Sequence, residues 1–321
     1  MNIYLDTNVY SYLLEAGEAR KACKYFREIN AKILVSDAVT LETIRVPKRN
    51  ERLRRLKTVR TISNLRIDPP TPYREAMEIL SEIRRCRPMW LEPTPDEFMV
   101  KKFLRLSRST WRQLKYGELV EPTVHLPEYL RDAEPATREY LDSQRQTRQA
   151  FLEADNLELR ASNDKVHKYL EPVGQTERYW RLHSARVWAR ALNGEPAMRD
   201  YKDFLGPYLV SPIDAKDWVL FWVRDVNGKA MPVGCLRSAI EFHQVAAKIT
   251  HGNSMDTEHG VHLGDCDLLL TCDKTFFKVL GLVTQEGVPG ARLGKPLLVP
   301  RQTSHSALEA IRRVVDDAVS A

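Results

Sequence analysis

The chain has few cysteines, and none of them is paired at a metal-binding spacing. They are odd in number and widely scattered, and no CxxC occurs among the 321 residues: Cys23, Cys86, Cys235, Cys266 and Cys272. This pattern indicates neither a disulfide framework nor a cysteine zinc site. Reduced thiols fit a cytoplasmic protein. The start of the chain shows no basic, apolar leader, so we expect no signal peptide and a cytoplasmic location.

Long apolar runs and nucleotide-binding loops are also missing. No stretch approaches the roughly 20 apolar residues that a membrane span needs, so we expect no membrane partner. Neither GxxxxGK[ST] nor GxGxxG occurs, so nothing supports nucleotide-driven activity. The hydrophobic fraction of 43% and the charged fraction of 29% are globular values, which argues against extensive disorder.

Basic residues outnumber acidic ones, and they are concentrated in one segment. The net charge of +6 favours an anionic partner, nucleic acid first, although an indifferent basic surface is common. Segment 45–66 (RVPKRNERLRRLKTVRTISNLR) carries nine Lys or Arg and a single acid, Glu51. Its apolar residues keep a helical period, so we expect a helix with one buried and one basic face. That basic face either grips phosphates or is simply solvated.

Two short apolar runs near the amino terminus are each followed by an acid. Residues 3–5 read as a buried strand, and Asp6 comes directly after it. A second buried strand over 32–35 precedes a helix that carries Glu42 one and a half turns from its start. Ligands of open α/β sheets bind beyond the carboxyl ends of the strands, where these acids would lie. Each acid is equally compatible with an ordinary capping or surface role.

The pattern of strand and acid returns near the other end of the chain. Asp256 opens a short helix, and an apolar strand over 268–270 then ends in Thr271-Cys272-Asp273. A final short strand is expected over 296–300 and a closing helix over 307–319.

Four further polar residues of this region are assigned ordinary roles. Asp265 and Asp267 precede the strand, at its opposite end from Asp273, and are expected to serve the turn. His259 and His262 lie near Asp256, but no HExxH spacing supports a zinc site. We expect both histidines to lie on the helix surface.

The order of these motifs resembles the PIN domain, a family of metal-dependent nucleases. The matching fragments are LDTN with Asp6, VSDAVTLE with Glu42, SMDTEHG with Asp256 and LTCDKTF with Asp273, and the last two acids are 17 residues apart. The resemblance covers residues 1–66 and 236–321. It implies an α/β fold with a three-layer α/β/α core and a parallel sheet, in which strand 268–270 lies beside strand 3–5.

The resemblance also implies the site. Asp6, Glu42, Asp256 and Asp273 would be the catalytic residues and would hold one or two Mg²⁺ or Mn²⁺ ions. Such cations prefer oxygen ligands, lower the pKa of bound water and neutralise phosphate oxygens, and four acids in one pocket repel one another without them. Asp6, Asp256 and Asp273 would be inner ligands, directly or through water, with Glu42 positioning the bound water.

Three neighbours complete the candidate site. Asn8 and Thr271 are placed to orient a carboxylate or a phosphate oxygen. Lys274 is placed to contact a phosphate, although a solvated lysine is at least as compatible with the pattern.

A large insertion separates this chain from small members of the family. Residues 67–235 begin with a proline-rich break and then carry helical patterns over 73–87, 95–116, 135–170, 175–193 and 196–205. All six tryptophans fall here and are expected to build cores. Segment 177–190 interleaves aromatic residues with arginines, which can stack bases or dock a protein. We expect the insertion to select substrate, bind a regulator or support a homo-oligomer.

The sequence therefore predicts a divalent-metal-dependent endonuclease that acts on nucleic acid, RNA in preference to DNA, in the setting of a toxin or defence effector. Two alternatives stay open. One is a PIN-fold scaffold or regulatory protein-binding module with weak or no cleavage. The other is a DNA-directed nuclease.

Overall fold

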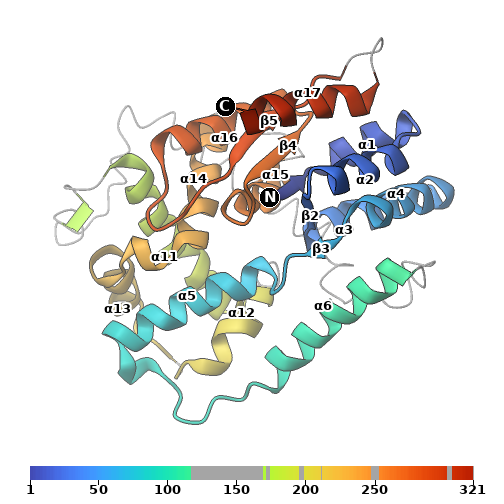
Figure 1. Cartoon of the computed structure of the whole chain (residues 1–321). Coiled ribbons are helices and arrows are strands. Elements are labelled where there is room, and N and C mark those ends of the chain that lie inside the picture. The colour runs from blue at the N-terminus through green and yellow to red at the C-terminus, as the bar shows by residue number, and fades with distance from the viewer. Residues whose placement is uncertain are drawn as a thin grey trace.

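The computed structural model describes residues 1–116, 169–170, 174–194, 199–210, 212–246, 253–301 and 306–320. Its strands are β1 (Asn2–Leu5), β2 (Lys32–Val35), β3 (Leu65–Arg66), β4 (Leu268–Thr271) and β5 (Lys295–Leu298). Its helices (Figure 1) are α1 (Thr7–Glu15), α2 (Ala19–Glu28), α3 (Asp37–Ile44), α4 (Arg49–Ile62), α5 (Thr71–Cys86), α6 (Phe98–Tyr116), α11 (Gln175–Leu192), α12 (Arg199–Leu205), α13 (Ala215–Leu220), α14 (Pro232–Ala246), α15 (Asn253–Gly260), α16 (Lys274–Glu286) and α17 (Ala307–Ser320). Shorter helical turns are η1 (Pro88–Trp90), η3 (Gly206–Tyr208), the π-helical η4 (Phe221–Asp225), η5 (Gly228–Ala230) and η6 (Val261–Gly264).

The five strands form one parallel sheet in the order β3-β2-β1-β4-β5. The central strand β1 pairs with β2 on one side and with β4 on the other, so Tyr4 lies opposite both Leu34 and Leu269. Two segments more than 260 residues apart in the chain are therefore direct neighbours. Strands buried on both faces read as continuous apolar runs, and Leu268–Thr271 is buried throughout.

Helices cover both faces of the sheet. The chain moves from β1 through β2 to β3 in one direction and from β4 to β5 in the other, so right-handed crossovers place the connecting helices on opposite faces. α1 packs against α2, α4 and α17, whereas α14 packs against α15 and α16. The α/β class, the parallel sheet and the three-layer core predicted from the sequence are confirmed.

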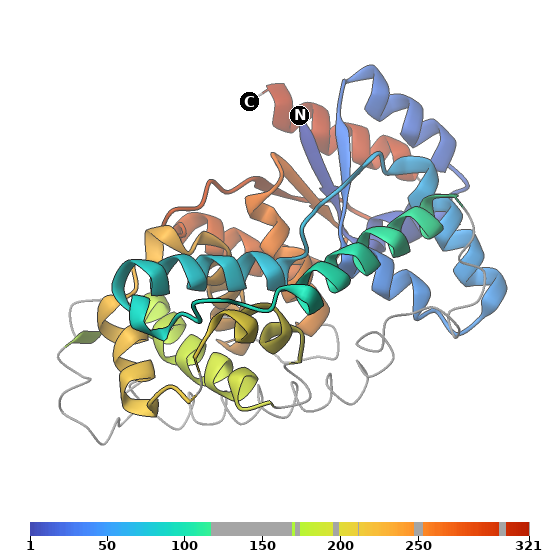
Figure 2. The ribbon, with the colours of Figure 1, turned by 90° about the horizontal axis from the view of Figure 1, so that it is seen from below.

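The remaining helices form a part of the molecule that extends to one side of the sheet (Figure 2). α11 packs against α14, α12 and α13, and α5 packs against α12 and α14. One hydrophobic cluster is continuous from the sheet into this part, and it includes Ile3, Leu269, Trp180 and Trp222. None of the helices in the described ranges has both the length and the apolar content needed to cross a membrane.

α6 connects the helical part to the N-terminal helices. At one end Phe103 contacts Phe204 of α12 edge to face, with ring centroids 4.7 Å apart. At the other end Trp111 packs against Ile44 and Leu56, which belong to α3 and α4. The helix predicted over 95–116 is therefore present and docks on both parts.

The sequence predicts a single helix over segment 45–66, and this prediction is wrong at the carboxyl end of the segment. α4 stops at Ile62, and Leu65–Arg66 forms the edge strand β3 against Leu34 and Val35. Two residues are too short a run to show a strand period, and the tertiary pairing with β2 decides their conformation. The helix predicted over 135–170 lies outside the described residues, apart from Tyr169 and Leu170.

Candidate metal centre

Asp6 lies at the carboxyl end of the central strand. Its backbone N–H still donates to Leu270 O at 3.0 Å, so β4 holds the residue directly after β1. Asp6 occupies the N-cap position of α1, yet its carboxylate caps no backbone N–H there. The side chain is instead buried, 4% exposed, and turned towards β4 and α15. The carboxylate is thus available for a role other than capping.

Asn8 and Thr271 fix the orientation of the Asp6 carboxylate. Thr271 Oγ1 donates to Asp6 Oδ2 at 2.7 Å, and Asn8 Nδ2 donates to the same oxygen at 2.5 Å. The other end of the Asn8 amide is held as well, because Cys272 N–H donates to Asn8 Oδ1 at 2.7 Å. One carboxylate oxygen, Oδ2, is therefore engaged by both neighbours, while Oδ1 faces the centre of the site, where His259 Nε2 lies 3.7 Å away.

Glu42 reaches the same point from α3. Ser36 caps this helix by accepting from Val39 N–H, which sets the start of α3 directly after β2. Glu42 Oε2 lies 2.9 Å from His259 Nε2, and the Glu42 side chain is 29% exposed. Burial acts to raise the pKa of Glu42, but the hydrogen bond and charge of His259 outweigh burial and lower that pKa. Glu42 is therefore ionised at neutral pH.

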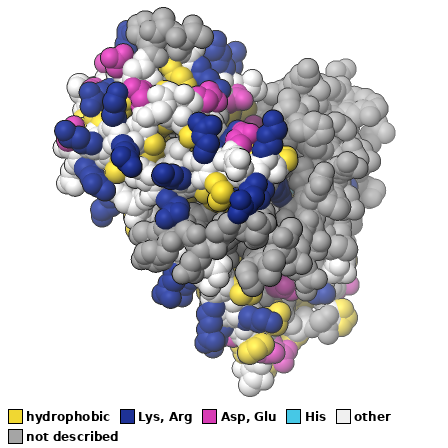
Figure 3. Space-filling model, turned by 90° about the vertical axis from the view of Figure 1, so that its right-hand side faces the viewer, with side chains coloured by type: hydrophobic (Ala, Val, Ile, Leu, Met, Phe, Trp, Pro, Cys, Tyr) yellow, Lys and Arg dark blue, Asp and Glu magenta, His cyan; other side chains and the backbone are white. Residues whose placement is uncertain are grey.

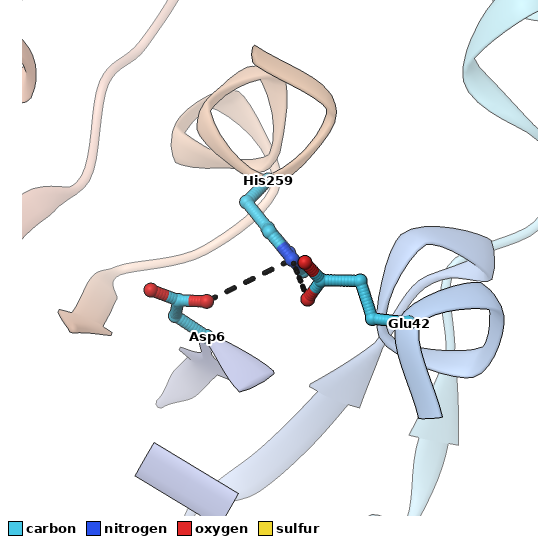
Figure 4. Close-up of side chains that lie close together, drawn as sticks. All are labelled: Asp6, Glu42 and His259. Atoms are coloured by element: carbon cyan, nitrogen blue, oxygen red, sulfur yellow. Dashed lines mark hydrogen bonds and ion pairs between the residues drawn. The ribbon is translucent and has the colours of Figure 1, made fainter. Parts of the chain in front are cut away.

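His259 is a buried centre of the site, so its predicted place on the helix surface is wrong. Its side chain is 1% exposed, and Nε2 faces Glu42 and Asp6 (Figure 4). Nδ1 lies 2.6 Å from the hydroxyl of Tyr4, which in turn lies 2.7 Å from Ser36 Oγ. Burial acts to lower the pKa of His259, but the charges of Asp6 and Glu42 raise it to about 9.

Asp256 is carried one turn before His259 on α15, on the same helix face. Burial raises the pKa of its carboxyl to about 7, and the negative charges of Asp6, Asp273 and Glu42 add to this rise. Burial also raises the pKa of Asp6 above its ordinary value. We call Asp6, Glu42, Asp256 and His259 the carboxylate–histidine cluster.

Asp273 lies at the edge of this cluster and is exposed. It is the N-cap of α16, where its Oδ1 accepts from Thr275 N–H at 2.6 Å and from Phe276 N–H at 2.9 Å. Its charge is close enough to contribute to the raised pKa of Asp256. Lys274 follows it and is exposed. The structure thus brings Asp6 and Glu42 together most tightly, with Asp256 beside them and Asp273 at the rim.

The donors of the cluster suit a divalent cation. One ligand atom from each of Asp6, Glu42 and His259 lies within 4.8 Å of the others. Carboxylate oxygens match Mg²⁺ and Mn²⁺, and an imidazole nitrogen matches transition metals such as Mn²⁺ better than Mg²⁺. Burial is the main cause of the raised pKa values of Asp6 and Asp256, with neighbouring carboxylates adding to the rise, and a cation among these groups would stabilise their ionised forms.

The sequence reasoning missed three residues around the cluster. His259 lies three residues after Asp256, which puts both side chains on one helix face, but no local pattern shows that this face is buried. Arg45 Nη1 lies 3.9 Å from Met255 Sδ, next to Asp256. Arg301 Nη2 donates to Asn8 O at 2.9 Å. The positions of the two arginines depend on contacts distant in sequence and leave no local signal.

Residues at the far end of β4 serve the fold, as the sequence suggested for the two aspartates. Asp267 accepts from Asn2 N–H at 2.8 Å. Asp265 pairs with Arg74 and lies 2.8 Å from His262 Nδ1. His262 is 3% exposed, so its predicted surface position is wrong. Its ring packs against Tyr4, with centroids 4.9 Å apart.

The aromatic residues of segment 177–190 do not form a base-stacking surface. Tyr179, Trp180 and Trp188 are all buried, at 5%, 2% and 4% exposure. Arg181 is also buried and pairs with Glu177 of its own helix. The tryptophans of this segment therefore build a core, which was the alternative that the sequence favoured.

A comparison with protein families gives one match, and it agrees with the geometry. The model of the PIN domain matches residues 3–88, which include Asp6 and Glu42. Asp256 and Asp273 lie beyond the matched residues, and pairing of β4 with β1 brings them to the same edge of the sheet. No curated protein and no solved structure matches the chain. PIN domains are in general metal-dependent nucleases, often ribonucleases. Residues 3–88 of this chain therefore match the PIN-domain family.

Proposed function

We propose that this protein is a Mg²⁺- or Mn²⁺-dependent endonuclease whose substrate is RNA. One observation carries the proposal: Asp6, Glu42 and Asp256, from three separate elements, converge with His259 beyond the carboxyl ends of the central strands. Holding these carboxylates together costs folding free energy, which a purely structural scaffold has no need to accept. The same convergence argues against the scaffold alternative.

The cluster residues divide the binding of the cation among them. Asp6, Asp256 and, from the rim, Asp273 are the proposed carboxylate ligands, with His259 as a nitrogen donor beside them. A divalent cation held there supplies water of lowered pKa and neutralises charge on the phosphate. Asn8 and Thr271 keep the Asp6 carboxylate in one orientation through their two hydrogen bonds to Oδ2.

Glu42 is the group that we assign to the attacking water. Its carboxylate is ionised, partly exposed and held on one side by His259, so it can accept a hydrogen bond from water in a fixed direction. In hydrolysis the water oxygen bonds to phosphorus, one P–O ester bond breaks, and the proton from water ends on the released oxygen. Lys274 is exposed beside Asp273 and is a proposed contact for a non-bridging phosphate oxygen.

RNA is preferred to DNA because PIN domains are often ribonucleases. The basic helices α2 and α4 favour nucleic acid of either kind. A DNA-directed nuclease is the second candidate for the same site. Residues 67–235 are the proposed region for substrate selection, for a protein regulator or for homo-oligomer contacts.

A cleavage assay separates these functions. The purified full chain is incubated with single-stranded RNA or DNA of the same sequence, in Mn²⁺, Mg²⁺ or EDTA. We expect cleavage of RNA that needs the metal and is lost in Asp6→Asn and Asp256→Ala. Asp317→Asn changes an exposed acid of α17 and is the matched control. No metal-dependent cleavage of either substrate would favour the scaffold, and cleavage of DNA alone would favour the second candidate.

We also propose a cytoplasmic toxin or defence effector as the setting of this activity. Induced expression in a bacterial host tests this directly. Growth arrest by the parent chain, with normal growth of cells that express Asp6→Asn at equal level, is the expected result. Equal growth of the two strains would remove the toxin role while leaving the nuclease activity to the cleavage assay.

A further inference from the structure

A groove of about 590 Å³ lies between α1 and the start of α4. We call it the basic groove, and its lining residues are Ser11, Leu14, Glu15, Lys48, Arg49, Asn50, Glu51, Arg54 and Arg55. Four of these nine side chains are cationic and two are acidic. The groove is formed on one wall by α1 and on the other by the first two turns of α4.

The charges on the α4 wall are arranged to favour an anion. Of the two acids in the groove, Glu51 is already paired, because Arg55 Nη2 donates to its Oε1 at 2.7 Å. Lys48 is the N-cap of α4, and its side chain accepts no hydrogen bond from the first N–H groups of the helix. Arg55 Nε is buried with no hydrogen-bond partner among the described residues. Helix N-termini and arginine donors are groups that bind phosphate oxygens.

Both walls of the groove begin at the carboxylate–histidine cluster. On α1, Thr7 lies 3.4 Å from His259 Nε2, and Ser11 and Glu15 follow it at one and two helical turns on the same face. Glu15 is therefore about 12 Å along α1 from the cluster. On the other wall Glu42 is followed by Arg45, which contacts Met255, and then by Lys48 at the start of α4.

The surrounding surface carries the same sign of charge. Figure 3 shows Lys and Arg side chains spread over the side of the molecule where α1, α2 and α4 end, with fewer acids between them. The exposed cations of α2 and α4 on the described surface include Arg20, Lys24, Arg27, Arg54, Lys57 and Arg60. A chain of phosphates would be attracted to this face over a distance of about a Debye length, 8–10 Å.

We propose that the basic groove binds the phosphate backbone of single-stranded nucleic acid for a few nucleotides on one side of the bond that is cut. The inference rests on the proposed function for the identity of the site at its end. The contacts are to phosphates, so binding in the groove is independent of base sequence. No stacking aromatic residue lines the groove, and base recognition is therefore assigned elsewhere.

The test uses the full chain with Asp6→Asn, so that bound RNA is not cut. Fluorescence anisotropy gives the Kd for single-stranded RNA of 4 and 15 nucleotides between 50 and 200 mM salt. Lys48→Glu/Arg54→Glu reverses two exposed cations of the groove. Arg292→Glu/Lys295→Glu makes the same change of charge at the start of β5, at the opposite end of the sheet from the cluster, and is the matched control. Circular dichroism and thermal unfolding check that each variant is folded.

We expect the groove variant to bind the 15-nucleotide RNA at least tenfold more weakly, and the control to stay within twofold of the parent. The slope of log Kd against log salt should fall by about 1.4, since each phosphate contact to a single strand contributes about 0.7. The loss should be smaller for the 4-nucleotide RNA, which occupies less of the groove. In the cleaving parent background, the same substitutions should raise KM for long RNA more than for short RNA.

The outcomes separate this inference from the proposed function. If RNA binding depends on the groove but the chain cuts no nucleic acid, the binding role of the groove is supported and the proposed nuclease function is contradicted. If cleavage is metal-dependent but the groove variant and the control variant have equal Kd and KM, the proposal that the basic groove binds RNA is overturned. Tighter binding of an acidic polypeptide than of the RNA at equal charge concentration also overturns it, since an acidic protein surface would then be the partner.

Discussion

His259 Nε2 lies 2.9 Å from Glu42 Oε2, which joins α15 to α3 across 217 residues of sequence. The same nitrogen is 3.7 Å from Asp6 Oδ1, and the ring is buried. In the metal-free protein the protonated imidazole therefore provides the positive charge that the two carboxylates need at this point, and it fixes the position of Glu42. Its removal should affect stability, metal binding and cleavage together.

We expect His259→Ala to lower the free energy of unfolding in EDTA by roughly 3 kcal/mol, because the change leaves buried carboxylates without their counter-charge. The affinity for Mn²⁺ should fall about 10–100-fold as a ligand or its orienting contact is lost. Chemical denaturation and isothermal titration with Mn²⁺ measure the two effects. His262→Ala removes the other buried histidine of this region and should cost stability without weakening Mn²⁺ binding. Equal Mn²⁺ affinities in both variants would contradict the assignment.

The pH dependence of His259 provides a second prediction for the metal-free protein. Its pKa in the folded state is about 9, against an ordinary value of 6.5, so protonation stabilises the fold. This stabilisation is complete below pH 6.5 and is lost as the pH rises through 9. The difference in unfolding free energy between the parent and His259→Gln, measured in EDTA, should therefore shrink between pH 6.5 and 9.5. A difference that is constant over this range would mean that the imidazole stays neutral.

Asp256→Asn should abolish cleavage and stabilise the metal-free protein. The folded-state pKa of Asp256 is about 7, against an ordinary value of 3.8, so its ionised form destabilises the fold. The parent should lose stability relative to the variant as pH rises from about 4 to 7, reaching roughly 2–4 kcal/mol above pH 7. Thermal unfolding in EDTA at pH 5 and 8 measures this difference. Saturating Mn²⁺ should reverse it at pH 8, and Asp317→Asn should show neither effect.

The strands that carry the site were predictable because their pattern is local. Residues 3–5 and 268–270 are short apolar runs that each end near an acid, and burial on both faces of a parallel sheet produces such runs. The edge strand Leu65–Arg66 was not predictable. It is two residues long, half exposed, and exists through its pairing with β2.

The carboxylates could be named from the sequence, whereas the histidine could not be placed. A lone histidine on a short helix has the same sequence pattern on a surface as in a core. His259 is buried because Tyr4 and Ser36 surround the Nδ1 edge of its ring. These two residues lie 255 and 223 positions earlier in the chain. Asp273 shows the reverse case, because its spacing was informative but its carboxylate is also engaged as the cap of α16.

Thr271 is expected to act on cleavage through Asp6. It is fully buried, and its hydroxyl donates to Asp6 Oδ2 while accepting from Asp273 N–H at 3.0 Å. Thr271→Val keeps the shape and removes these two bonds, together with the bond that the hydroxyl accepts from Asn8 Nδ2 at 3.2 Å. We therefore expect kcat to fall about 10–100-fold with little change in KM. Thr271→Ser retains the hydroxyl and should recover most of the rate. Equal kcat in the Val and Ser variants would show that the hydroxyl only supports the fold.

Glu78 provides a test of the packing between α5 and α14, away from the metal centre. Its carboxylate accepts from Val233 N–H at 2.9 Å and Gly234 N–H at 3.1 Å, at the start of α14. Burial raises its pKa to about 7, which the two backbone hydrogen bonds only partly oppose.

Because this pKa is raised above the ordinary value of 4.5, the contribution of Glu78 to stability is greatest below pH 4.5 and is lost as the pH rises through 7. We expect the parent to lose roughly 1–3 kcal/mol relative to Glu78→Gln between pH 4.5 and 8. Urea denaturation at both pH values measures this change. Glu309→Gln changes an exposed acid of α17 and is the matched control for the loss of one carboxylate. If the parent instead gains stability over Glu78→Gln as the pH rises, the two backbone bonds outweigh the cost of burying the charge.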